Sequence, residues 1–230
     1  GIWIAGLTLL WVSLAGANVR QLLGDLDGPT NLVPLIFEAV LLIPLTALFA
    51  ALVEATSPIS GDEQGQPGHP SLPPLGFDGI RAALEPRTFL ACLAAAVVAA
   101  SVVGWLAAIT PYKGQALFAA FLGGIAAGWA SAFAASTSHH GRPSSLIPAV
   151  ITLPLVAALT FLFLKFSANG AVIAQTRAIA SESGNQLFAL GRILPLDWLA
   201  GGLLGVPVGA NWAASMVDRH HHADAHARTA

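Results

Sequence analysis

The chain has 230 residues, of which 55 % are hydrophobic and only 10 % are charged, and its net charge is −2. A soluble domain carries roughly 25 % charged residues, because its surface must stay hydrated. A chain this poor in charge exposes apolar surface to water however it folds, unless lipid is its solvent. The composition therefore predicts an integral membrane protein. The near-neutral charge, without any cluster of Lys or Arg, gives no reason to expect nucleic acid as a partner.

Apolar stretches recur along the whole chain, and their length predicts how they fold. A hydrocarbon core of ~30 Å needs about 20 helical residues, and backbone amides in lipid must be satisfied within each segment. None of the stretches alternates polar and apolar residues with a period of two, so we expect α-helices. The segments are 2–19, 31–53, 88–110, 115–136, 146–168 and 195–217. We predict an all-α, polytopic transmembrane helix bundle of about six helices, one membrane domain over residues 1–230, in the cell membrane.

The first segment is the shortest, and two interpretations of it are open. Ala15-Gly16-Ala17 fits the small-x-small pattern at which signal peptides are cleaved. Trp3 and Trp11 are unusual in the core of a signal peptide, and they favour a helix that is retained. If the segment is cleaved, five spanning helices remain.

Three segments outside the apolar stretches differ in composition. Residues 54–87 are rich in Pro and Gly and should form a mobile loop, because they bury too little apolar surface to offset their ordering entropy. Residues 169–194 mix apolar and polar side chains, which indicates either an amphipathic helix at the membrane interface or a water-exposed loop. Residues 218–230 form a His-rich tail.

Glu38 is the most unusual residue of the membrane segments. It lies about 10 Å along the helix from the start of its segment, where an ionisable group costs several kcal/mol unless it is protonated, paired or facing water. Pro44, six residues later, cannot donate a backbone hydrogen bond. A carboxyl beside such an interruption is typical of ion or proton sites in transporters. The alternative is a carboxyl that reaches the interface or pairs for structural reasons.

Possible partners of Glu38 follow from the alternation of the segments. The connections after the first, third and fifth segments lie on one side of the membrane, which we call side B. Lys165, Arg192 and Asp197 fall near side B, at depths similar to that of Glu38. We predict an intramembrane polar site of these four residues, with Glu38 within salt-bridge or one-water distance of Lys165 or Arg192. Alternatively, Lys165 extends its side chain along the helix so that its amine reaches the membrane interface.

Small residues recur at four-residue spacing on two segments. Such stripes let two helix backbones approach closely, which is how helices associate in lipid. We predict helix packing through them, within the chain or, alternatively, against a membrane-protein partner or a second copy. The stripes are Ala120, Gly124, Gly128 and Ala132 on one segment and Gly201, Gly205 and Gly209 on the other.

The C-terminal tail carries the residue types that bind transition metals. Imidazole and carboxylate groups are ligands for zinc, nickel or copper. A tail without fixed geometry is expected to bind metal weakly, and a sensing or delivery role is the alternative. The residues concerned are His220, His221, His222, Asp224 and His226.

Asp25-Leu26-Asp27, in the first connection, resembles the paired acids of multi-spanning glycosyltransferases that use lipid-linked sugars. The resemblance is limited to these three residues, and the neighbouring glycines equally fit a solvated turn. No motif names a substrate or a cofactor. The sequence therefore favours a non-enzymatic transport component or a packing subunit of a larger membrane complex. The alternative is a membrane-embedded enzyme acting on a lipid or lipid-linked substrate through Asp25 and Asp27.

Overall fold

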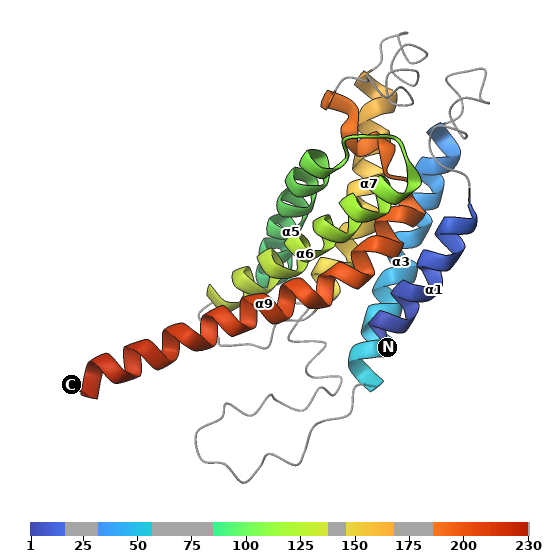
Figure 1. The fold of residues 1–230 in the computed structure, drawn as a ribbon. Coiled ribbons are helices and arrows are strands. Elements are labelled where there is room, and N and C mark those ends of the chain that lie inside the picture. The colour runs from blue at the N-terminus through green and yellow to red at the C-terminus, as the bar shows by residue number, and fades with distance from the viewer. Residues whose placement is uncertain (17–31, 57–84, 138–145, 168–185, 230) are drawn as a thin grey trace.

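The computed structural model describes residues 1–16, 32–56, 85–137, 146–167 and 186–229, and these residues form a bundle of helices (Figure 1). Each α-helix coincides with one of the predicted segments, which confirms an all-α helix bundle. No strand is present in the described ranges. The elements are α1 (Ile2–Ala15), α3 (Leu32–Thr56), α5 (Pro86–Ala107), α6 (Lys113–Thr137), α7 (Ile147–Ser167), the 3-10 helix η3 (Gln186–Arg192) and α9 (Pro195–Thr229).

Four of these helices, α3, α5, α6 and α7, are long and apolar enough to cross a membrane, as expected of a multi-pass membrane protein. The described part of α1 has 14 residues, which span about 21 Å and fall short of a ~30 Å hydrocarbon core. The 35 residues of α9 exceed the required length, but its polar His-rich C-terminal part and its glycines lower its hydropathy. α9 packs against α6, α1 and α7. A helix enclosed by other helices needs small residues for close packing more than large side chains for lipid.

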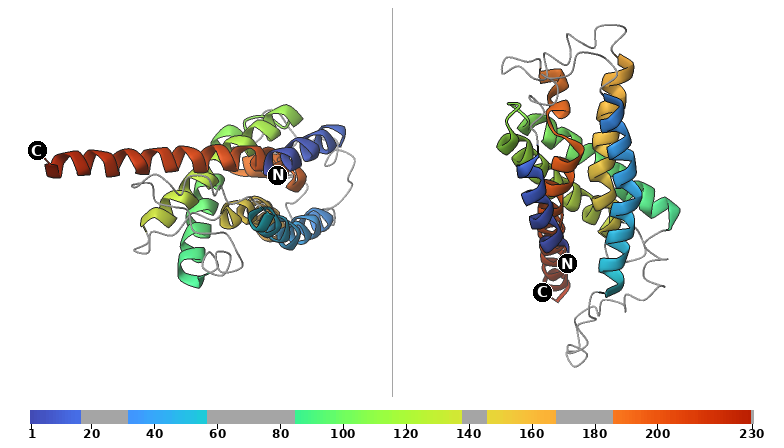
Figure 2. Two further views of the ribbon diagram at one scale, coloured as in Figure 1. Left: turned by 90° about the horizontal axis from the view of Figure 1, so that it is seen from below. Right: turned by 90° about the vertical axis from the view of Figure 1, so that its right-hand side faces the viewer.

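The helices associate unequally. The most extensive contact joins α6 and α9, followed by that between α5 and α6, while α3 packs mainly on α7 and α1 on α9. α1 lies against α9, and α9 extends well beyond the other helices at its C-terminal end (Figure 1; Figure 2, left). α3 and α5 are largely exposed, whereas α6 and α7 are largely buried. The exposed apolar faces of α3 and α5 are the surfaces that lipid covers in a bilayer.

The two stripes of small residues face each other across the α6–α9 contact. A Cβ atom added to Gly124 or Gly128 would overlap the backbone of α9, at Gly202 and Val206 respectively. Reciprocally, a Cβ on Gly205 or Gly209 would overlap carbonyl oxygens of α6. A Cβ on Gly201 would likewise overlap the carbonyl oxygen of Leu117 and approach the Cβ of Ala120. At the far end, Ala132 packs in a cluster with Ala210 and Ala213.

Packing within the chain is therefore the correct interpretation of the stripes, and their use as an outward-facing surface is wrong. Close approach of α6 and α9 leaves no room there for a partner helix. This removes the feature that supported a role as a packing subunit.

The connections are described only in part. α3 continues to Thr56 and α5 begins at Pro86, so most of the predicted mobile loop, 57–84, lies outside the described residues. Of the predicted amphipathic connection, residues 169–185 also lie outside them, while Ala189, Arg192 and Ile193 are buried in the bundle. The backbone of α9 continues as helix through the His-rich tail to Thr229.

Candidate functional site

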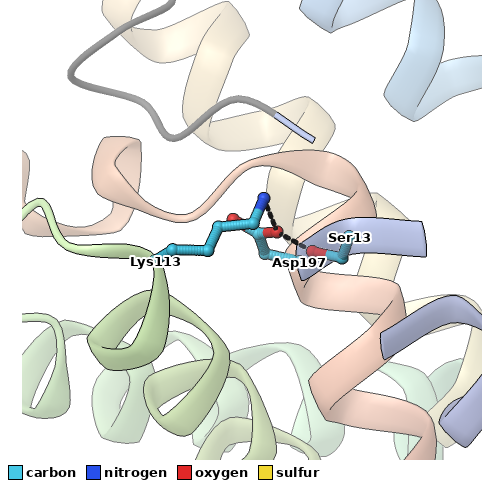
Figure 3. Close-up of polar contacts among 3 residues, drawn as sticks. All are labelled: Ser13, Lys113 and Asp197. Atoms are coloured by element: carbon cyan, nitrogen blue, oxygen red, sulfur yellow. Dashed lines mark hydrogen bonds and ion pairs between the residues drawn. The ribbon is translucent and has the colours of Figure 1, made fainter. Parts of the chain in front are cut away.

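Three helices meet at the carboxylate of Asp197, which is only 1 % exposed. Asp197 lies in the first turn of α9, where the partial positive charge of a helix N-terminus favours an acidic side chain. The hydroxyl of Ser13, in α1, donates a hydrogen bond to Asp197 Oδ1. Lys113, the first residue of α6, places its Nζ 2.6 Å from the same oxygen (Figure 3). α1, α6 and α9 are thus joined at side B by one carboxylate oxygen.

The second oxygen of this carboxylate, Oδ2, differs from Oδ1 in its contacts. Asp197 Oδ2 is buried and has no hydrogen-bond partner among the described residues. A buried acceptor that loses its hydrogen bonds to water costs about 1–3 kcal/mol, and more when it is charged. Asp197 Oδ2 can therefore still accept a hydrogen bond or pair with a positive charge.

The position of Lys113 explains why it pairs with Asp197. A positive charge is unfavourable at a helix N-terminus, and Lys113 opens α6 with a side chain that is only 15 % exposed. An ion pair with a buried carboxylate offsets both costs. The connection from α5 is short, with Ala108 and Pro111 buried, so it holds Lys113 against the bundle.

Glu38 lies in the first two turns of α3. Its side chain is partly buried, and the described charges that act on it are those of Asp197 and Lys113. The expected pairing of Glu38 with Lys165 or Arg192 stays a prediction. Lys165 is exposed near the end of α7. We call Ser13, Glu38, Lys113 and Asp197 the polar cluster; in it, the ammonium group of Lys113 pairs with Asp197, and the charges of both act on Glu38.

Arg192, a predicted partner of Glu38, is 1 % exposed and binds backbone carbonyl oxygens. Its Nη1 lies 2.8 Å from the carbonyl oxygen of Ala108 and 2.6 Å from that of Ile109, and it donates to both. These carbonyls directly follow the C-terminus of α5, where a cation is favourable. Gln115 donates to the neighbouring carbonyl of Ala107. Burial lowers the pKa of Arg192, although arginine stays protonated at neutral pH. Arg192 thus fixes the turn that carries Lys113.

Replacing Arg192 by Met should destabilise the protein by about 1–3 kcal/mol, because the carbonyls of Ala108 and Ile109 lose a charged donor in a buried place. The measurement is reversible unfolding in detergent micelles. Lys165→Met, which removes an exposed cation near the same side, is the matched control and should change stability by less than about 0.5 kcal/mol. Equal stability of the two variants would contradict the role of Arg192.

Trp198 follows Asp197 and is fully buried. Its ring lies against Gly104 of α5 and Gly123 of α6, so neither position has room for a side chain. Its Nε1 is buried without a hydrogen-bond partner among the described residues. A tryptophan near the start of a segment is typical of an interfacial anchor, and here the enclosed position of α9 places it in the core instead.

The remaining predicted site residues are not tested. Asp25 and Asp27 lie outside the described residues, as do the side chains of the tail from His220 to His226. Within the described ranges, no group of three or more His, Cys, Asp and Glu residues is placed to hold a metal ion. The metal and enzyme hypotheses on these residues stay predictions.

Two residues of the polar cluster were not among the predicted site residues. Lys113 had a signal: it lies in a short connection on side B, opposite in charge to Glu38 and Asp197. Lys165 is also a positively charged residue near side B. Only the lateral order of the helices determines which of the two lysines lies near Asp197. Ser13 had no signal, because a serine in an apolar helix satisfies its own hydroxyl by bonding to the preceding turn.

No protein-family model, curated protein or solved structure matches the chain. The residues of the polar cluster themselves indicate what it can bind. Two carboxyls, an ammonium and a hydroxyl in an apolar bundle can bind a cation, exchange a proton or hold the charged part of a solute. Ionisable groups within membrane bundles typically mark such pathways.

Proposed function

We propose that the chain is a transport component of the cell membrane, in which the polar cluster holds an ion or the charged part of a solute. The observation that carries this proposal is the buried Asp197 carboxylate, with one oxygen paired to Lys113 and the other without a partner among the described residues. A buried ion pair contributes little stability compared with apolar packing of similar volume. A cluster with unused binding capacity is better explained by a ligand than by stability.

The way the cluster is assembled supports this proposal. Its residues come from α1, α3, α6 and α9. α6 and α9 are held together by backbone contacts at their glycines, whereas α3 has little contact with α9 and rests mainly on α7. Movement of α3 relative to the α6–α9 pair would open the cluster on the side of Glu38 without breaking the tightest interface. Transporters commonly expose their binding sites by such rigid-body movements.

Pro44 is placed to assist this movement. α3 continues as one helix through Pro44, so the helix is not broken there. Proline still removes the hydrogen bond to the carbonyl of Val40, less than one turn beyond Glu38. A helix bends most easily at such a position. The part of α3 that carries Glu38 can then tilt while the rest stays packed on α7.

The proposal is tested by charge movement in proteoliposomes adsorbed on a solid-supported membrane. Concentration jumps of protons, Na⁺, K⁺, Cl⁻ and small acidic and basic solutes should produce a current for at least one of them. Asp197→Asn keeps the shape of the side chain, and it should lower the apparent affinity at least about tenfold, which is about 1.4 kcal/mol of binding. Lys165→Gln, an exposed charge at the same side, should leave the current unchanged. Wild-type protein without any current, or Asp197→Asn with the same current, would contradict the proposal.

A further inference from the structure

A groove with a volume of about 350 Å³ lies where α5, α6 and α9 meet. Its surface is apolar, and none of the residues of the polar cluster lines it. Volumes of this size are typical of sites for small molecules. Because the groove is separate from the polar cluster, its occupant is independent of the proposed transport function. Its lining includes Val103 of α5, Leu122, Ala126 and Trp129 of α6, and Trp212 and Met216 of α9.

The groove results from how α5 and α9 are placed on α6. Both helices pack on α6, whereas the described residues of α5 and α9 have little contact with each other. Near the start of α9, the ring of Trp198 fills the space between Gly104 of α5 and Gly123 of α6. Farther along, α5 and α9 run in different directions (Figure 2, left). The side chain of Ala126 is a single methyl group, which does not fill the space that opens there.

Close packing keeps the groove from collapsing. A Cβ atom on Gly128 or Gly209 would overlap the backbone of the facing helix, so α6 and α9 touch through their backbones. Movement of α9 into the groove would separate these contacts. On α6, the ring of Trp129 stacks on that of Phe133, with centroids 5.4 Å apart and planes inclined by 8°. The groove is therefore formed before any ligand enters it.

The surroundings of the groove are those of a lipid-covered surface. Trp212 and Met216 are 53 % and 38 % exposed, so the groove is open on the side of α9. The adjacent face of α5 carries the exposed side chains of Val98 and Val102, and both α5 and α6 are long and apolar enough to cross a membrane. A water molecule in an apolar groove finds too few polar partners to bind. Hydrocarbon from the bilayer is therefore the material that suits this groove.

We propose that the groove binds an acyl chain of a membrane phospholipid, which stays with the protein when bulk lipid is removed. An acyl chain is narrow and flexible, so it can contact Ala126, Trp129 and Trp212 at once. A second copy of the chain fits less well, because an α-helix is ~10–12 Å wide and rises ~5.4 Å per turn, and the groove holds less than one turn. The bound acyl chain fills the space between α5 and α9, as Trp198 does near the start of α9.

The test is retention of phospholipid by protein purified in detergent. Wild-type protein is reconstituted with phosphatidylcholine, washed in a mild detergent and measured by native mass spectrometry, and we expect a phospholipid to remain bound. Ala126→Leu places a larger side chain in the groove and should weaken this binding at least about tenfold. Ala94→Leu, the same change at an exposed position of α5, is the matched control and should bind as wild type does. Absence of retained lipid, or equal retention by wild type and Ala126→Leu, would overturn the proposal.

Photochemical labelling locates the retained lipid in the wild-type protein, so this result does not depend on the folding of a variant. The phosphatidylcholine then carries a diazirine near the middle of an acyl chain, and irradiation follows the detergent wash, so that only retained lipid reacts. Peptide mass spectrometry should find the adducts on residues 122–129 of α6 or near Trp212 of α9. Adducts confined to the exposed faces of α3 and α5 would overturn the proposal. A dimer without lipid would also overturn it and would assign the groove to a second copy.

Discussion

Lys113→Met is expected to destabilise the folded protein by about 3–5 kcal/mol, the usual cost of removing one partner of a buried ion pair. Asp197 is 1 % exposed, and its Oδ1 lies 2.6 Å from Lys113 Nζ. Without the ammonium it must remain charged and unpaired or take up a proton, and both cost free energy at neutral pH. Reversible unfolding in mixed micelles measures this effect.

A double-mutant cycle separates the ion pair from other effects of these substitutions. Asp197→Asn alone leaves the ammonium of Lys113 without its counter-charge, and the double variant with Lys113→Met should recover part of the loss. Coupling energies of residues in direct contact are typically about 0.5–3 kcal/mol. Lys165→Met controls for the loss of a cation at side B. If the double variant loses the sum of the two single losses, the pair contributes nothing specific.

The second large effect is expected at the α6–α9 interface. A Cβ atom on Gly209 would overlap the carbonyl oxygen of Ile125, and backbone cannot rotate away as a side chain can. Gly209→Ala should therefore separate the two helices and destabilise the protein by at least about 1–3 kcal/mol, the range for overpacked cores. The same unfolding measurement applies.

Two other glycines supply matched controls for this effect. A Cβ on Gly202 meets only the side chain of Leu153, which can shift, so Gly202→Ala should cost less than Gly209→Ala. A Cβ on Gly114 meets nothing within 4 Å. Gly114→Ala should be neutral or stabilise by up to about 1 kcal/mol, the difference in helix propensity. Similar stabilities of the three variants would show that the glycines are not needed for close approach.

The sequence was sufficient to predict the helices. Lipid offers the backbone no hydrogen bonds, so apolar length alone predicts helices such as α3 and α7. The spacing of Gly124 and Gly128, and of Gly205 and Gly209, likewise identified two close-packing faces, since four residues are about one helical turn. The alternation of the segments also placed Lys113 and Asp197 on the same side, and the structure joins them in an ion pair.

Which helices lie next to one another in the membrane plane was decided by the tertiary packing. Lys113 and Lys165 lie near the same side of the membrane, and only the order of the helices brings Lys113 to Asp197 and leaves Lys165 exposed. In the same way, the contact of α1 with α9 brings Ser13 to Asp197. The physical reason is that hydrocarbon discriminates polar from apolar residues along the membrane normal but is the same in every direction within the membrane plane. The lateral arrangement is therefore fixed by the fit of side chains between helices, which residue types and spacing in a single sequence do not specify.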